Sequence, residues 1–198
     1  MSRFRAARPV LLAGLVLVFV AGCETPVESP VFPELRFTER PPIRLDVVRV
    51  ETVEKYASPF EAPNVEHLFP VRPASAARRW VEDRLSPAGA GRVARVTIEN
   101  ASVVEVPLET RGGLIGLFYN DQAARYDAEV ALRVEILSDG GAPEAFARAV
   151  ARHSRTVPED ITLNERDAVF YELTTALFDD LDAELESTIR RHLRPFLR

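Results

Sequence analysis

The C-terminal part of the chain carries the pattern that most limits its fold. Thr162 and Glu165 have the spacing of a capping box, in which the threonine hydroxyl and the glutamate carboxylate each satisfy a free backbone amide at the start of a helix. Apolar side chains then recur every four residues, at Val169, Leu173, Leu177, Leu181, Leu185, Ile189 and Leu193. The pattern predicts one long amphipathic helix. Because a strict four-residue repeat drifts by about 40° per step, we expect the N-terminal half to cover a sheet and the C-terminal half to project, bend or meet another surface.

Three segments alternate in the manner of strands. From Tyr126 to Leu137 every second residue faces the core and the others face water. Val93 to Val106 alternates similarly, and its expected apolar face consists of Ala94, Val96, Ile98, Val104 and Val106. Ile43 to Lys55 is the first candidate strand, and a phase change near Val48 indicates a β-bulge.

The segment from Glu144 to Val157 fits two readings. Its alternating alanines suit a strand by their spacing and a helix by their propensity. Ser138 to Gly141 forms a tight turn just before it, which favours a hairpin. We therefore predict a strand, whose small inner residues would leave room for a helix laid across the sheet.

A shorter helix is predicted from Ala74 to Ser86, where Trp80, Val81 and Leu85 fall near one side and Pro87 ends the pattern. With the other elements it gives an α+β domain. We expect an antiparallel sheet of about four strands with two helices packed on one face, in the order β-α-β-β-β-α.

The N-terminus is organised as a secretory signal. Three arginines precede an apolar run from Val10 to Val20 and the small residues Ala21 and Gly22. The run is shorter than the roughly 17 residues that a membrane-spanning helix needs, and the flanking arginines and prolines fit targeting better than a buried core helix. Val20 to Cys23 resembles a bacterial lipobox. That resemblance implies cleavage before Cys23 and attachment of lipid, palmitate included, to its thiol.

The lipobox resemblance also implies a location. Glu24 follows Cys23, whereas aspartate there is the inner-membrane retention signal of enterobacterial lipoproteins. We therefore expect an outer-membrane lipid anchor facing the periplasm, with an inner-membrane anchor as the alternative. Residues 1–22 are then a signal peptide, residues 23–42 a lipidated N-terminus with a proline-rich linker, and residues 43–198 one periplasmic domain.

The linker and the charge balance restrict the partners of such a domain. Five prolines between Glu24 and Pro42 predict an extended spacer, which at about 3.1 Å per residue reaches up to about 60 Å. Removing residues 1–22 deletes three arginines and no acids, so the formal net charge falls from −5 to −8. A chain this acidic is a poor candidate for nucleic acid.

No catalytic or metal-binding pattern is apparent. His67, His153 and His192 lack the spacing to acids or cysteines that builds a metal site, so we expect ordinary surface or boundary histidines and no cofactor. No nucleophile elbow occurs, and Ser154 would lie on the strand face opposite His153. A hydrolase is the third and weakest hypothesis.

Charges gather on the last predicted helix. The acids are Asp179, Asp180, Asp182, Glu184 and Glu186, and the basic residues are Arg190, Arg191, His192, Arg194 and Arg198. We expect a solvated face, with the cations placed favourably near the helix C-terminus. The alternative is that the basic end touches anionic lipid headgroups or an acidic partner.

An apolar stretch follows two glycines between two predicted strands. Its large side chains are Leu114, Ile115, Leu117, Phe118 and Tyr119. If exposed, such a patch marks a contact site for a partner or lipid. The alternative is a short edge strand or loop that folds back onto the core.

The lipobox, the helix at Arg79-Trp80, the strand from Tyr126 to Leu137 and the last helix together resemble the auxiliary lipoproteins of ABC-type and mammalian-cell-entry-type lipid transport systems, and more distantly the lipopolysaccharide-assembly lipoproteins. The resemblance implies a non-enzymatic accessory lipoprotein that binds protein components of an envelope transport or assembly machine. The alternative is a lipid- or small-ligand-binding lipoprotein, with its pocket between sheet and helices.

Overall fold

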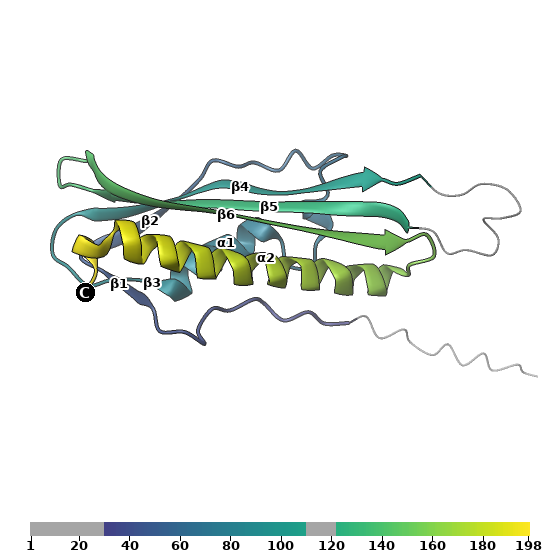
Figure 1. Ribbon diagram of the computed structural model, residues 1–198, viewed down its shortest axis with the longest axis horizontal. Helices are drawn as coiled ribbons and strands as arrows, with labels where there is room; N and C mark the ends of the chain where they lie inside the picture. The colour runs from purple at the N-terminus through teal and green to yellow at the C-terminus, as the bar shows by residue number, and fades with distance from the viewer. Residues whose placement is uncertain (1–29, 110–121) are drawn as a thin grey trace, which may run out of the picture.

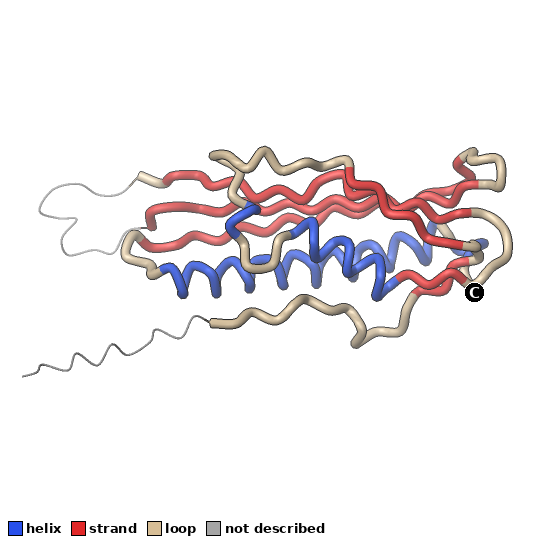
Figure 2. The backbone as a smooth tube through the Cα atoms, turned by 180° about the vertical axis from the view of Figure 1, so that it is seen from behind, coloured by secondary structure: helices blue, strands red, loops and turns tan. Residues whose placement is uncertain are grey.

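The computed structural model describes residues 30–109 and 122–198. One layer is a four-stranded sheet in the order β2-β4-β5-β6, formed by Arg49–Glu54, Val93–Pro107, Gln122–Leu137 and Pro143–Pro158. The second layer is made of helices α1 (Pro73–Arg84) and α2 (Leu163–His192), which lie on the same face of the sheet (Figures 1 and 2). The predicted α+β fold, with about four sheet strands and two helices on one face, is confirmed.

The sheet is mixed rather than wholly antiparallel. β4, β5 and β6 pair antiparallel, but β2 pairs parallel to β4, with Arg49 beside Val93 and Glu54 beside Ile98. The reason lies in the connection: α1 carries the chain back between β2 and β4, and a crossover of this kind brings the second strand in along the direction of the first.

The first predicted strand is divided between two sheets. β1 (Ile43–Leu45) pairs parallel with β3 (Leu85–Pro87) as a separate two-stranded sheet, while β2 joins the main sheet. At the break, the Val48 N–H donates to the Arg92 carbonyl over 3.1 Å. The phase change near Val48 therefore marks a change of pairing partner, and the prediction of a β-bulge there is wrong.

A bulge does occur, in β4. The register with β5 shifts between Ile98 and Asn100, which leaves Glu99 as the extra residue. Beyond it Ala101 and Val103 are fully buried, while Val104 and Val106 are only partly buried. One inserted residue moves every later side chain to the other face, so the prediction that Val104 and Val106 face the core is wrong.

The predicted strand from Glu144 to Val157 is confirmed as β6, and its alanines lie beneath α2. Ala147, Ala149 and Ala151 are at most 5% exposed. Their small side chains allow α2 to lie close to the strand along its length (Figure 1). The predicted capping box of α2 is also confirmed, because the Glu165 N–H donates to the Thr162 hydroxyl over 3.3 Å and the Thr162 N–H donates to the Glu165 carboxylate over 3.0 Å.

The C-terminal half of α2 is covered, not projecting. Leu181, Leu185 and Ile189 in this half, and Leu193 directly after it, are fully buried. The last residues fold back onto β1, where Leu197 forms a bridge with Leu45 and the Arg198 N–H donates to the Arg44 carbonyl over 2.9 Å. Of the three alternatives expected for this half, that it projects, bends or meets another surface, the structure shows the last: the second surface is formed by the small β1-β3 sheet and the C-terminal residues.

The packing of α2 on β6 can be tested by overfilling it. Ala149→Leu adds three carbon atoms beneath the helix, and we expect it to lower the free energy of unfolding by about 1–3 kcal/mol. Val150→Leu, one residue on and on the opposite face, adds one carbon atom to a partly exposed side chain and serves as the control. Urea unfolding followed by circular dichroism measures both. Equal loss in the two variants would contradict the packing described.

Candidate functional site

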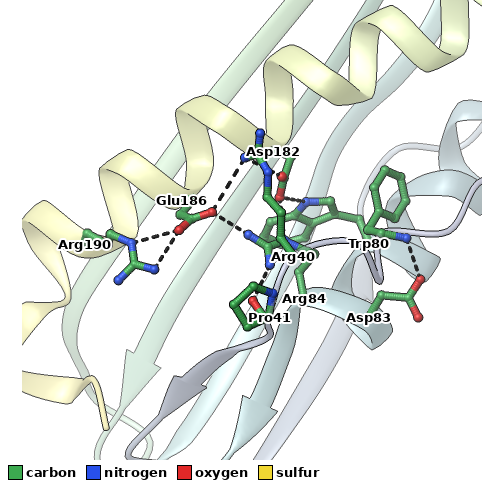
Figure 3. Close-up of polar contacts among 9 residues, drawn as sticks. Arg40, Pro41, Trp80, Asp83, Arg84, Asp182, Glu186 and Arg190 are labelled. Atoms are coloured by element: carbon green, nitrogen blue, oxygen red, sulfur yellow. Dashed lines mark hydrogen bonds and ion pairs between the residues drawn. The ribbon is translucent and has the colours of Figure 1, made fainter.

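A buried polar cluster joins both helices to the N-terminal segment (Figure 3). Its centre is the carboxylate of Asp182, on the side of α2 that faces α1 and the N-terminal segment. Oδ1 accepts hydrogen bonds from the Trp80 indole N–H at 2.8 Å and from Arg84 Nε at 2.7 Å. Oδ2 accepts one from Arg40 Nη1 at 3.1 Å. One carboxylate thus connects α1, α2 and the segment that precedes β1.

Arg84 is the second member of the cluster, and its side chain is only 1% exposed. Beyond Asp182, its two terminal nitrogens donate to the Glu186 carboxylate and to the Pro41 carbonyl, each at 2.5 Å. Glu186 also accepts from Arg190 at 2.7 Å. A buried guanidinium is tolerated only when its charge and its N–H groups are matched, and the cluster supplies partners for the whole fork.

The N-terminal segment is held along α1 by further pairs. The Asp83 carboxylate accepts from Arg36 Nε at 2.8 Å and from the Phe37 N–H at 2.9 Å, and Glu34 pairs with Arg79. The hydrogen bond from Arg36 lowers the pKa of Asp83 below its ordinary value, outweighing the opposite effect of burial. The part of the expected spacer nearest the domain is therefore folded onto it.

Aromatic contacts support the same attachment. Phe32 stacks on Tyr171 with ring centroids 5.3 Å apart, and Phe37 lies 5.6 Å from Phe178. Both partners are on α2. We define the anchor segment as residues 32–41, and its contacts run along both helices. The expectation of a free spacer over the whole of 24–42 is wrong for this part.

The buried polar cluster around Asp182 was not apparent from the sequence. Asp182 was expected on a solvated face with its acidic neighbours, yet it is 7% exposed. The Asp83 side chain on α1 is likewise only 4% exposed. A signal was present: Asp182 follows Phe178 by four residues and precedes Leu185 by three, which places it on the buried stripe. Of the other acids named with it, Asp179, Asp180 and Glu184 are exposed as expected, whereas Glu186 is only partly exposed and pairs with Arg84.

A second buried carboxylate fixes the crossing between β2 and α1. Glu66, 4% exposed, accepts from the Tyr56 hydroxyl at 2.6 Å and from the Val103 N–H at 3.1 Å. Burial acts to raise the pKa of Glu66, but hydrogen bonds from Ser58 and Tyr56 outweigh it and the net pKa is lowered. Burial and the bond to Glu66 raise the pKa of Tyr56. A surface hollow of about 430 Å³ lies beside this pair, with Phe60 and His67 on its wall.

Most of the residues predicted as functional from the sequence do not belong to these two buried clusters. Cys23 and the apolar stretch with Leu114, Ile115, Leu117, Phe118 and Tyr119 lie outside the described residues. His153 Nε2 is 2.7 Å from Asp180 Oδ2, His67 is partly buried and His192 is exposed. Arg190, Arg191, Arg194 and Arg198 are exposed at the end of α2 and beyond it.

The described ranges contain no cluster of three or more histidine, cysteine or acidic side chains suited to a metal ion. The two buried acids described above are engaged by fixed donors, which suits holding elements together rather than transferring protons. No helix in residues 30–109 or 122–198 combines the length and apolar character needed to cross a membrane.

Removing the central carboxylate tests the role of the cluster. Asp182→Ala leaves the Arg84 charge and the Trp80 N–H buried without their partner, so we expect a loss of about 3–5 kcal/mol in unfolding free energy. Asp179→Ala, which removes an exposed acid three residues earlier, should change it by less than about 0.5 kcal/mol. Urea unfolding measures both. A loss below about 1 kcal/mol for Asp182→Ala would contradict the account.

The pairing of Arg36 with Asp83 predicts a pH dependence. Because the folded pKa of Asp83 is depressed, its contribution is complete above the ordinary aspartate value of about 4 and is lost as the pH falls through the folded pKa. Wild type should therefore have a higher urea midpoint than Arg36→Gln at pH 7, and the gap should narrow below about pH 4. A gap that is constant down to pH 2 would show that another interaction is responsible.

The comparisons with known proteins show no family for this chain. No family model and no curated protein matches it. Among solved structures, a PelC dodecamer from Paraburkholderia phytofirmans is similar at 14% sequence identity and a TM-score of 0.21, over 77% of this chain and 93% of that one. A likeness this distant carries no argument about the fold, assembly or function of this chain.

Proposed function

We propose that this protein is a lipid-anchored periplasmic lipoprotein, held by Cys23 to the outer membrane, that acts as a non-enzymatic accessory or assembly component of an envelope transport system. The proposal joins two features. The N-terminal sequence supplies the lipobox and the expected attachment point. The folded domain supplies the anchor segment, which begins nine residues after Cys23 in the sequence and packs on both helices.

The observation that carries the proposal is the docking of the anchor segment. Phe32 to Pro41 is fixed by Arg36, Phe37 and Arg40 to residues of α1 and α2. Nine residue steps separate Cys23 from Phe32, which reach at most about 30 Å when fully extended. A lipid on Cys23 would then hold the domain near the bilayer and restrict its orientation, as suits a module that presents one surface to neighbouring proteins.

The apolar stretch has a place in this proposal. β4 ends at Pro107 and β5 begins at Gln122 at the same end of the sheet where the described N-terminal segment begins (Figures 1 and 2). The strand ends that flank the connection containing Leu114 to Tyr119 thus lie at the end of the domain nearest the proposed lipid attachment. We keep these residues as the proposed partner or lipid contact.

A ligand-binding role is the second candidate, on a different surface from the one expected. The space between sheet and helices is filled by side chains such as Leu132, Ala149 and Leu177, each at most 3% exposed. The hollow of about 430 Å³ beside Glu66 and His67 has the size of a small-molecule site. Native mass spectrometry of the purified protein tests this role, and the absence of any bound small molecule would count against it.

Purification from the native envelope tests the main proposal. After crosslinking and extraction in mild detergent, we expect the protein in a complex with other envelope proteins. Cys23→Ser should lose incorporation of labelled palmitate and leave the membrane fraction, because its lipid attachment atom is gone. Recovery of the wild type only as a free monomer, or membrane retention of the serine variant, would contradict the proposal.

A further inference from the structure

β6 is a long edge strand of the main sheet. Among the described strands it pairs only with β5, over its whole length from Pro143 to Pro158. Its register is uninterrupted from Ala145 to Val157, and its two prolines lie at the ends. Edge strands are commonly protected by bulges, internal prolines or inward-pointing charges. None of these three features occurs in the middle of β6, where the pairing with β5 is regular. The backbone of β6 is therefore able to pair with a further strand.

The backbone groups that face this edge follow from the ladder. On β4, the Ile98 carbonyl accepts from Lys55 and Tyr56, on the side away from β5. Its cross-strand partner Leu132 therefore turns its backbone groups toward β6, where it pairs with Ala149. Because the direction alternates along a strand, Arg148 and Val150 direct their N–H and C=O groups to the free edge.

A groove lies along this edge, between β6 and α2. Two adjoining hollows of about 580 and 540 Å³ share Arg148 and run beside residues 144–152 of β6. Nine extended residues span about 30 Å. Ala183 and Thr188 of α2 line the opposite wall. The groove has the length and the exposed backbone that an added strand requires.

The charges of the groove indicate what would occupy it. Asp180 and Glu184 of α2 line its wall and are exposed. The nearby arginines of β6 are already neutralised on the outer face of the sheet: Arg148 pairs with Glu99 at 2.6 Å and Arg152 with Glu129 at 2.7 Å. With both arginines paired to other acids, Asp180 and Glu184 give the α2 wall of the groove an acidic character, and Asp180 also lies 2.7 Å from His153 Nε2 of β6. A second copy would bring the same acids to this edge.

We infer that the groove between β6 and α2 binds an extended segment of a protein partner, which adds to the sheet as a strand beside β6. Lysine or arginine side chains at alternate positions of that segment pair with Asp180 and Glu184. Phe146, half exposed on β6 with Arg133 stacked 3.9 Å from its ring, offers an apolar contact on the other face. The inference rests on the proposed accessory function and names the surface through which it would operate.

Site-specific photocrosslinking in the native envelope tests this inference. p-Benzoylphenylalanine in place of Ala183 should crosslink to one extended, lysine- or arginine-bearing segment of a partner, identified by mass spectrometry. The same probe in place of Asp179, exposed on α2 but outside the groove, is the positional control. Crosslinking from Ala183 to a second copy of this chain, or to lipid alone, would overturn the inference.

Two substitutions examine the mechanism of binding. Val150→Pro removes an edge N–H and should reduce the Ala183 crosslink roughly tenfold, whereas Val150→Thr keeps the N–H and should preserve it. Asp180→Lys should reduce the crosslink without altering the backbone, and Asp179→Lys should not. Unchanged yields in Val150→Pro and Asp180→Lys while the envelope complex persists would overturn the inference but leave the proposed function standing. Loss of any envelope complex in wild type would overturn both.

Discussion

The charge of Asp182 sets the arrangement of the helices and the N-terminus. Asp182 is only 7% exposed, and its carboxylate accepts hydrogen bonds from three donors in different parts of the chain: Trp80 and Arg84 from α1, and Arg40 from the anchor segment. None of these donors is local in sequence to Asp182. Burying a carboxylate or a guanidinium alone is strongly unfavourable, whereas each compensates the charge of the other when they are paired. The pairing therefore stabilises α1, α2 and the anchor segment as one unit.

The packing of α2 on the sheet depends on the size of side chains rather than on charge. The alanines of β6 let α2 lie along the strand, and the same contact leaves the outer side of β6 as a sheet edge with a groove beside it. The anchor segment and the free edge of β6 therefore both adjoin the same layer of helices. In the proposed lipoprotein, the anchor segment would lead from the lipid to the helices, and the edge of β6 would be left for a partner.

The elements of this fold were largely predictable, because their patterns are local. The capping box at Thr162, the alternation of Tyr126 to Leu137 and the hairpin before β6 each depend on neighbouring residues. What could not be predicted depends on distant ones. The bulge at Glu99 has no glycine to mark it, and the parallel pairing of β2 follows from where α1 lies. The spacing of Asp182 to Phe178 and Leu185 places it on the buried stripe, but the donors that match its charge lie about a hundred residues away. For the same reason the anchor segment resembled a free linker.

The central claim is that the anchor segment is part of the folded domain. Spin labels at Val31, an exposed position next to Phe32, and at Glu172, next to the Tyr171 on which Phe32 stacks, allow the distance across this contact to be measured by pulsed electron paramagnetic resonance. The account predicts one narrow distance distribution, unchanged between detergent and lipid vesicles. A broad distribution, as from a flexible linker, would contradict it.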